Sequence, residues 1–286
     1  MLNALTIDVE DYFQVTAFDD LVSRRDWDHM PSRVVANTRR ILRMLDRHGV
    51  RATFFVLGWV ASRFPELVRE IHRAGHEVGC HSFWHARVYT LSPDEFREDL
   101  RLACDVLADI TGTAVTAYRA PSFSITRHSL WALDILAEEG LRYDSSIFPV
   151  YHDRYGIPDA DRSPHRIATR GGELLEFPAT VARLWKLNLP ISGGGYFRLA
   201  PLSWSASALR QTNDELRRPF VFYIHPWEMD PNQPRVTGAG WTKWRHYVNL
   251  ATTESKFDWL LQNFRFGCLG EVLDGLFCRS ADRIPA

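Results

Sequence analysis

The chain has 286 residues, enough for one large α/β domain or two small ones. Its hydrophobic content of 45% and charged content of 24% are ordinary for a globular protein with a sizeable core. The formal net charge of −1 gives no electrostatic reason to expect nucleic acid or an anionic membrane surface as a partner.

The start of the chain shows no export signal. Residues 1–11 lack a basic segment followed by an apolar one, and they lead directly into a predicted strand. No apolar run reaches the roughly 18–20 residues that a membrane-spanning helix needs. If the chain is full length, we expect it to be cytoplasmic, so that it would act on nucleotide-linked or lipid-linked sugar precursors.

The first half of the chain alternates predicted strands and helices. We expect strands at residues 2–9, 51–57, 77–80, 115–118 and 142–145. We expect helices at residues 32–49, 65–74, 92–110 and 126–140. Ser32 is the expected N-cap of the first helix, and Ser92-Pro93-Asp94-Glu95 is a typical helix start. Alternation of strand and helix predicts parallel βαβ units.

The second half is less regular. We expect strands at residues 174–177, 219–224 and 265–269, and helices at residues 201–210 and 253–264. Residues 151–172 and 228–247 have the composition of long loops. No low-complexity linker divides the chain, so residues 1–286 are expected to form one catalytic domain, with residues 229–286 as a C-terminal extension of it.

These elements predict an α/β fold, a distorted (β/α) barrel with about seven parallel strands and outer helices. An open doubly wound sheet is the alternative. No glycine-rich phosphate-binding motif follows the first strand, and this counts against a dinucleotide site.

Two histidines separated by four positions, in His81-Ser-Phe-Trp-His85, are the strongest chemical signal in the chain. Imidazoles at positions i and i+4 of a helical turn point the same way and can share one metal ion. Imidazole suits zinc, iron, copper and nickel. The plainer interpretation is a polar helix start.

Polar side chains also follow four other predicted strands. They lie in Asp8-Val-Glu10-Asp11, Arg119-Ala-Pro121-Ser-Phe123, Asp144-Ser-Ser146 and His225-Pro-Trp227-Glu228. Each has an ordinary structural explanation when taken alone, as a helix cap or a turn. Catalytic groups of a (β/α) barrel gather at the carboxyl ends of its strands, so five such groups in order favour an active site.

This order resembles the polysaccharide deacetylase family, that is, the NodB-homology enzymes or carbohydrate esterase family 4. The matching positions are Asp8, the His81–His85 motif, Arg119-Ala-Pro121, Asp144 and Tyr223-Ile-His225. Further stretches around Asp8, Gly193 and His225 are similar to the subfamily associated with exopolysaccharide loci of exosortase (PEP-CTERM) bacteria.

The resemblance implies hydrolysis of an N-acetyl group on an amino sugar, with one divalent metal, zinc above cobalt, nickel or iron. It implies that Asp8 is the general base and that Arg119 keeps Asp8 ionised and oriented. His225 is implied to be the general acid, with Asp144 as a candidate to orient it. His81 and His85 are implied metal ligands.

The first motif departs from the family pattern, because position nine is Val where the family has a second Asp. The carboxylate ligand must then be Glu10 or Asp11. Alternation along a strand favours Glu10 beside Asp8, whereas a chain that has already turned would present Asp11. The departure also puts the metal in question, since related enzymes with altered motifs act without one on small amides.

A carbohydrate is the expected partner. Candidate substrate-binding residues are Trp84, Pro121, Phe123, Gly194, Tyr196 and Trp227. Flat aromatic rings can stack on sugars, and glycine lets a backbone approach closely. Core packing and a tight turn are the plainer interpretations of the same residues. Two further hypotheses stand beside the deacetylase: a metal-free hydrolase of a small amide, and a carbohydrate-binding domain without catalysis.

Overall fold

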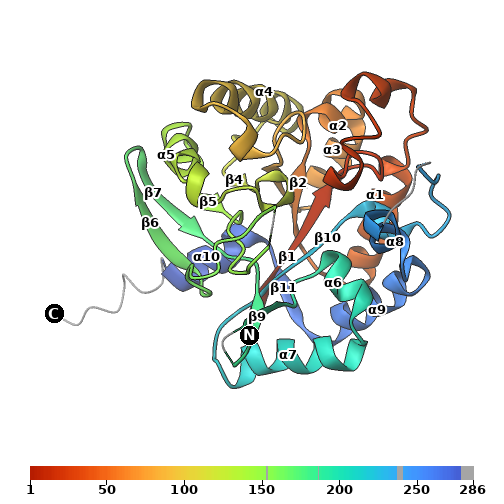
Figure 1. Cartoon of the computed structure of the whole chain (residues 1–286), viewed down its shortest axis with the longest axis vertical. Coiled ribbons are helices and arrows are strands. Elements are labelled where there is room, and N and C mark those ends of the chain that lie inside the picture. The colour runs from red at the N-terminus through yellow and green to blue at the C-terminus, as the bar shows by residue number, and fades with distance from the viewer. Residues whose placement is uncertain (153, 186, 237–240, 278–286) are drawn as a thin grey trace.

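The computed structural model describes residues 1–152, 154–185, 187–236 and 241–277. Within these residues, a nine-stranded sheet forms the centre of the molecule, in the order β10-β1-β2-β3-β4-β5-β7-β6, and β11 pairs with β1. Helices surround this sheet, and strands from the two ends of the chain lie side by side in it (Figure 1). The sheet strands are β1 (Leu2–Val9), β2 (Thr53–Val56), β3 (Glu77–Cys80), β4 (Ala117–Tyr118), β5 (Tyr143–Asp144), β6 (His165–Thr169), β7 (Gly172–Glu176), β10 (Val221–Ile224) and β11 (Arg265–Gly267).

The helices pack their apolar residues against the sheet. They are α1 (Val34–His48), α2 (Gly58–Arg63), α3 (Pro65–Arg73), α4 (Pro93–Thr111), α5 (Trp131–Glu138), α6 (Gly194–Leu199), α7 (Leu202–Asp214), α8 (Trp241–Tyr247), α9 (Leu250–Asn263) and α10 (Leu269–Phe277). A separate hairpin consists of β8 (Val181–Leu184) and β9 (Leu187–Pro190). No helix in the described part of the chain is both long and apolar enough to cross a bilayer.

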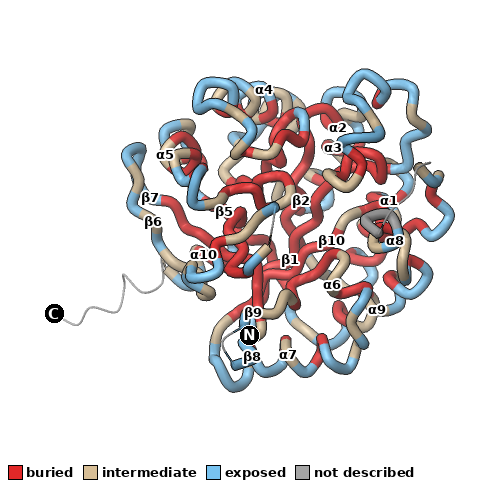
Figure 2. The backbone as a smooth tube through the Cα atoms, in the orientation of Figure 1, coloured by how far each residue is buried: buried red, intermediate tan, exposed pale blue. Residues whose placement is uncertain are grey.

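Strand β1 is the axis of the sheet. It pairs in parallel with β2, β10 and β11, and its residues from Asn3 to Val9 are buried. Figure 2 shows that buried backbone concentrates in these central strands. Every strand pair of the main sheet is parallel except β6 with β7. The predicted α/β fold with a mostly parallel sheet is therefore confirmed.

A short segment of backbone at residues 191–193 lies beside β10 and also bonds to Thr180, which follows β7. The amide of Ile191 donates to the carbonyl of Thr180 at 3.3 Å, and the amide of Tyr223 donates to the carbonyl of Ser192 at 2.7 Å. Gly193 then forms a parallel bridge with Tyr223 in β10. Residues 191–193 thus extend the pairing of the sheet beyond the edge of β10.

The helix starts show one correct and one incorrect prediction. Ser92 caps α4 in a capping box with Glu95, as its sequence indicates. Ser32, in contrast, is not the N-cap of α1. Its hydroxyl donates to the Asp11 carboxylate at 2.6 Å, and the same carboxylate oxygen accepts from the amides of Arg33 and Val34. Asp11, which lies 22 positions before Arg33, thus caps the start of α1.

Several elements were not predicted. Strand β6 lies inside the predicted loop at 151–172, and α8 lies inside the predicted loop at 228–247, of which residues 237–240 are outside the described residues. The hairpin β8–β9, helix α2 and helix α10 were also missed. Strand β6 is an antiparallel edge strand of the sheet with no fully buried residue, so it lacks an apolar signal.

We predict that Gly193→Ala will be strongly destabilising. Gly193 has φ 135°, which favours glycine, and a Cβ atom there would overlap the carbonyl of Tyr223. We expect the free energy of unfolding in urea to fall by about 3 kcal/mol or more. Gly112→Ala is the control, because Gly112 also has a positive φ but has open space around it, and should cost about 1–2 kcal/mol. Equal losses would show that Gly193 does not depend on this contact.

Candidate active site

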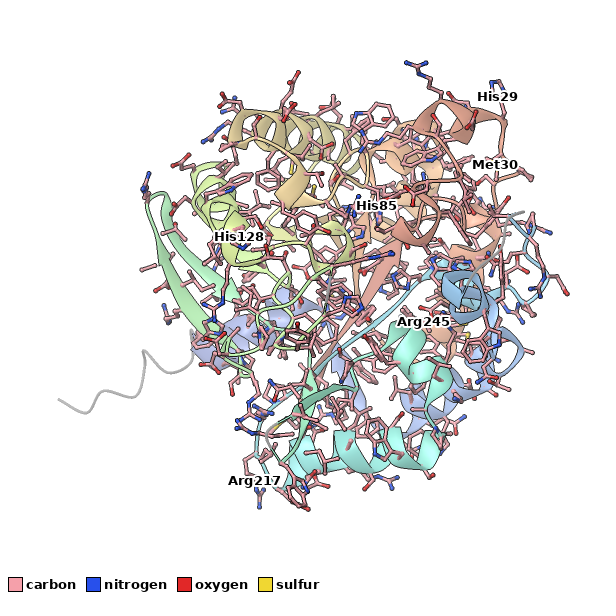
Figure 3. The ribbon with its side chains drawn as sticks, in the orientation of Figure 1. His29, Met30, His85, His128, Arg217 and Arg245 are labelled. Atoms are coloured by element: carbon pink, nitrogen blue, oxygen red, sulfur yellow. The ribbon has the colours of Figure 1, made fainter. Side chains whose placement is uncertain are left out.

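A cavity of about 420 Å³ lies at the carboxyl ends of the central strands. Its lining includes Asp8, Glu10, His81, His85 and His225, which end or follow β1, β3 and β10. Figure 3 shows His85 near the middle of the molecule. The parallel sheet therefore brings together, in one cavity, residues that are far apart in the sequence.

Arg119 lies fully buried beneath this cavity and holds Asp8. Its Nη1 donates to Oδ1 of Asp8 at 2.8 Å and to the hydroxyl of Thr6 at 2.6 Å. Its Nε and Nη2 donate to the backbone carbonyl and hydroxyl of Ser145. The Asp8 side chain is only 3% exposed, so the charge-assisted bond to Arg119 is shielded from water and fixes the direction of the carboxylate.

Glu10, His81 and His85 form a buried group of possible metal ligands. One donor atom of each lies within 4.8 Å of the others. The Nδ1 atom of His81 bonds to the carbonyl of Arg119 at 2.8 Å, so its Nε2 lone pair is left for a ligand. Burial lowers the pKa of His81 to about 4, which keeps the imidazole neutral, as a metal ligand must be.

The donor atoms of this group are suited to a metal ion. Nε2 of His85 lies 2.7 Å from Oε2 of Glu10, yet that carboxylate oxygen is buried without a hydrogen-bond partner. Burial alone would raise the pKa of Glu10, but its interactions with His85, and then with His225 and His81, lower it to about 2. Two imidazoles and one ionised carboxylate are a common donor set for zinc, and leave positions for water and substrate.

The structure separates the two candidate carboxylates. Glu10 faces the histidines, whereas Asp11 points toward the start of α1 and accepts from the amides of Tyr12, Arg33 and Val34. The Asp11 ligand hypothesis is therefore not supported by the geometry. The residue after Glu10 has turned away from the cavity because its carboxylate satisfies the free amides of a helix terminus.

The two histidines do not lie on a helical turn, which corrects the geometry assumed for their spacing. Residues 81–85 form a loop in which Ser82 and His85 have positive φ angles of 67° and 52°. Asp99 in α4 holds this loop by accepting from the amides of Phe83 and Trp84 at 2.8 and 3.2 Å. Sequence reasoning missed Asp99, because nothing in the chain links it to the histidine motif.

His225 is held from behind by Glu228. Its Nδ1 atom lies 2.7 Å from Oε1 of Glu228, so its Nε2 atom faces Asp8 at 3.8 Å and Glu10 at 3.7 Å. Burial alone would lower the pKa of His225, but the hydrogen bond to Glu228 and the charges of Glu10, Glu228 and Asp8 raise it to about 9. The imidazole can therefore carry a proton at neutral pH.

Arg198 of α6 completes this arrangement. Its Nε donates to Oε2 of Glu228 at 2.6 Å, and its Nη1 donates to the carbonyls of His246 and Val248. Burial would raise the pKa of Glu228, but Arg198 and then His225 keep it below its usual range. The sequence places Glu228 in the motif after the 219–224 strand but assigns it no role, and it offers Arg198 only as a contact for an anionic sugar or as a surface residue. The spacing of His225 and Glu228 is that of a capping box, and was an available signal.

Asp144 does not orient His225, in contrast to what the resemblance implies. Its Oδ1 accepts from the hydroxyl of Ser146 at 2.5 Å, and the Ser146 hydroxyl in turn accepts from the amide of Ala120. Its ionisable neighbour is Glu176, which accepts from the amide of Ile147. Burial, and then the charge of Asp144, raises the pKa of Glu176 well above its usual range. Asp144 thus braces the loop that follows Arg119.

The Trp227 side chain is buried against the candidate catalytic residues. Its Nε1 donates to Oε1 of Glu10 at 3.1 Å, and its ring stacks between His225 and His246. Only 5% of its surface is exposed, although it contributes to the cavity wall. Trp227 therefore orients Glu10 and His225, and a sugar platform is a secondary role at most.

The other candidate substrate-binding residues divide into two groups. Phe123 lines the cavity, whereas Trp84 lines a neighbouring cavity of about 230 Å³ together with Trp27. Pro121, Gly194 and Tyr196 do not line the catalytic cavity. Gly194 packs against the Tyr223 ring, and Gly195 is the glycine of this run that lines the cavity wall.

We predict that Glu228→Gln will lower the pKa of His225, because the neutral amide removes the charge that favours the imidazolium. The histidine resonances can be followed by NMR between pH 5 and 10 in the metal-free protein. The pH at the midpoint of the His225 titration should be lower in the variant by about one unit or more. Glu173→Gln removes an exposed carboxylate and is the control. An unchanged titration of His225 would contradict the assigned contact.

Two family models match adjoining parts of the chain. Residues 15–143 match the model described as polysaccharide deacetylase, and residues 145–274 match the domain of unknown function DUF3473. A peptidoglycan-N-acetylglucosamine deacetylase of Bacillus cereus is 35% identical over 98 residues, which are 34% of this chain and 36% of that protein. A chitooligosaccharide deacetylase of Bradyrhizobium is 32% identical over 101 residues, which are 35% of this chain and 43% of that protein. The matched segment thus spans less than half of either relative.

A solved structure from Mycobacterium smegmatis, described provisionally as a polysaccharide deacetylase, shares the fold. It aligns with a TM-score of 0.63 and 20% identity, over 99% of this chain and 91% of that one. The family models, the relatives and the fold agree with the resemblance in the sequence motifs. Residues 15–143 therefore form a polysaccharide deacetylase domain of the NodB, or carbohydrate esterase family 4, type, and residues 145–274 match the DUF3473 model.

Proposed function

We propose that this protein is a metal-dependent hydrolase that removes N-acetyl groups from amino sugars of an exopolysaccharide or of its precursor. The observation that carries the proposal is the meeting, in one cavity, of a buried carboxylate–arginine pair, a carboxylate–imidazole donor set and a histidine whose Nε2 faces both carboxylates. A binding domain without catalysis would not need a base, an acid and a metal site together. The deacetylase names of the relatives support the same reaction. The cytoplasmic location remains a prediction.

Glu10, His81 and His85 would hold the metal, zinc in our proposal, which polarises the amide carbonyl and lowers the pKa of the attacking water. Asp8 accepts a proton from that water, and Arg119 keeps Asp8 ionised and aimed at the cavity. The hydroxyl adds to the acetyl carbon, and the C–N bond breaks. His225 donates its Nε2 proton to the departing nitrogen, so that acetate and a free amine are the products.

Glu228 and Arg198 have a supporting task in this mechanism. Because Nδ1 of His225 bonds to Glu228, the proton available for transfer is the one on Nε2, on the side of the cavity. Arg198 prevents Glu228 from turning, since it fixes the second carboxylate oxygen. The acid and the base thus stand on one side of the cavity, with Nε2 of His225 3.8 Å from Oδ2 of Asp8.

We predict that Glu10→Gln will weaken zinc binding, whereas Asp11→Ala will lower the stability of the fold. Glu10→Gln should weaken zinc binding, measured by calorimetry on chelator-treated protein, by about 100-fold or more because a ligand charge is lost. Asp11→Ala should leave the zinc affinity within about threefold but lower the free energy of unfolding by about 1–2 kcal/mol, since a helix cap is removed. Loss of zinc in Asp11→Ala alone would instead make Asp11 the ligand.

We further predict that variants will separate metal binding from proton transfer. Asp8→Asn and His225→Gln should keep bound zinc while reducing acetate release from N-acetylglucosamine oligosaccharides by about 10²–10⁴-fold. His81→Ala and His85→Ala should lose both. His128→Ala, at an exposed histidine away from the cavity, is the control and should lose neither. Full acetate release by chelator-treated wild-type protein would replace this proposal with a metal-free amide hydrolase.

A further inference from the structure

Three arginines line the outer part of the catalytic cavity. Arg87 follows the histidine loop, Arg154 lies in the segment after β5, and Arg245 lies on α8. Figure 3 shows Arg245 on α8, with His85 near the middle of the molecule. Three segments from different parts of the chain therefore each contribute an arginine to the wall of one cavity.

These arginines are poorly neutralised. Arg87 lies 3.6 Å from Asp19, with about a third of its side chain exposed. Within the described residues the structure records no ion pair for Arg154 or Arg245. The Cζ atom of Arg245 lies 6.0 Å from the Tyr196 ring, a contact that steadies the side chain without cancelling its charge. Of the three, only Arg87 has a carboxylate partner recorded among the described residues.

The three arginines give this part of the cavity wall a positive charge, whereas the whole chain has a formal net charge of −1. It also differs from the floor of the cavity, where Asp8 and Glu10 balance Arg119 and His225. A guanidinium group can donate to the hydroxyl groups of a neutral sugar, but its positive charge adds binding energy only when the ligand is anionic. Arginine binds carboxylate and phosphate through two parallel hydrogen bonds, and such bonds are among the strong ones in proteins.

We propose that the substrate carries an anionic group, a carboxylate or a phosphate, next to the acetylated sugar, and that Arg87, Arg154 and Arg245 bind this group. The inference rests on the proposed function, because it places the acetamide in the cavity beside Asp8 and His225. The substrate class is then an acidic amino-sugar compound, either an oligosaccharide that contains a uronic acid or a sugar linked to a diphosphate.

Calorimetry with three probes tests the proposal on zinc-loaded Asp8→Asn protein, which binds without turnover. The probes are the neutral N,N′-diacetylchitobiose, a disaccharide of glucuronic acid and N-acetylglucosamine, and uridine diphosphate N-acetylglucosamine. At least one anionic probe should bind about tenfold or more tightly than the neutral one, and its advantage should fall as salt rises. The anionic probe that binds more tightly shows whether the anionic group is a carboxylate or a diphosphate. Equal or tighter binding of the neutral probe overturns the proposal.

The double variant Arg154→Gln/Arg245→Gln should reduce the preference for the anionic probe by about tenfold. The matched control is Arg73→Gln/Arg170→Gln, which removes the same charge from side chains that are 69% and 87% exposed and do not line the cavity. A preference that survives the first pair, or is lost equally in the control, would overturn the assignment.

The wild-type enzyme gives a second readout, in case the Asp8→Asn background does not fold. The ratio of kcat/KM for acetate release from anionic and neutral probes should exceed one and fall in the Arg154→Gln/Arg245→Gln variant. Absence of acetate from every probe counts against the proposed function, whereas the binding measurement still decides on the anion site. The two failures are therefore distinguishable.

Discussion

The buried guanidinium of Arg119 is the interaction on which the site depends. It binds Asp8 and Thr6 of β1 and Ser145 after β5, and the carbonyl of the same residue fixes the ring of His81. An unpaired charge in such a place would cost several kcal/mol, so the sheet is stable only with these partners in position. Arg119 therefore links the packing of the parallel sheet to the positions of Asp8 and His81.

The site needs both halves of the chain. His81, His85 and Arg119 lie within the part that matches polysaccharide deacetylases, whereas His225, Glu228 and Arg198 lie within the DUF3473 part. Arg198 also binds the carbonyls of His246 and Val248, so it connects the acid to the α8–α9 junction. The DUF3473 region therefore supplies the proposed proton donor, its support and part of the cavity wall, including Arg245.

The features that could be predicted from sequence are those with a local signal. Apolar runs located β1 and β10, and capping chemistry located the start of α4. The strand-end order also located the residues that now meet around the cavity. What failed depends on distant contacts. Asp11 caps a helix whose first turn lies 22 residues away. Asp99 in α4 holds the histidine loop. Asp144 accepts a hydrogen bond from Ser146 and does not contact His225 in the recorded bonds. The periodic patterns of a single sequence do not predict contacts of this kind.

The claim that a metal held by Glu10, His81 and His85 makes this cavity an N-deacetylase is tested most directly by a metal titration. Chelator-treated wild-type protein would receive zinc in steps, with acetate release from an N-acetylglucosamine oligosaccharide measured at each step. The account predicts negligible release without metal and a linear rise that ends at about one equivalent per chain. Full release before any metal is added, or none at any ratio for every acetylated sugar offered, would contradict it.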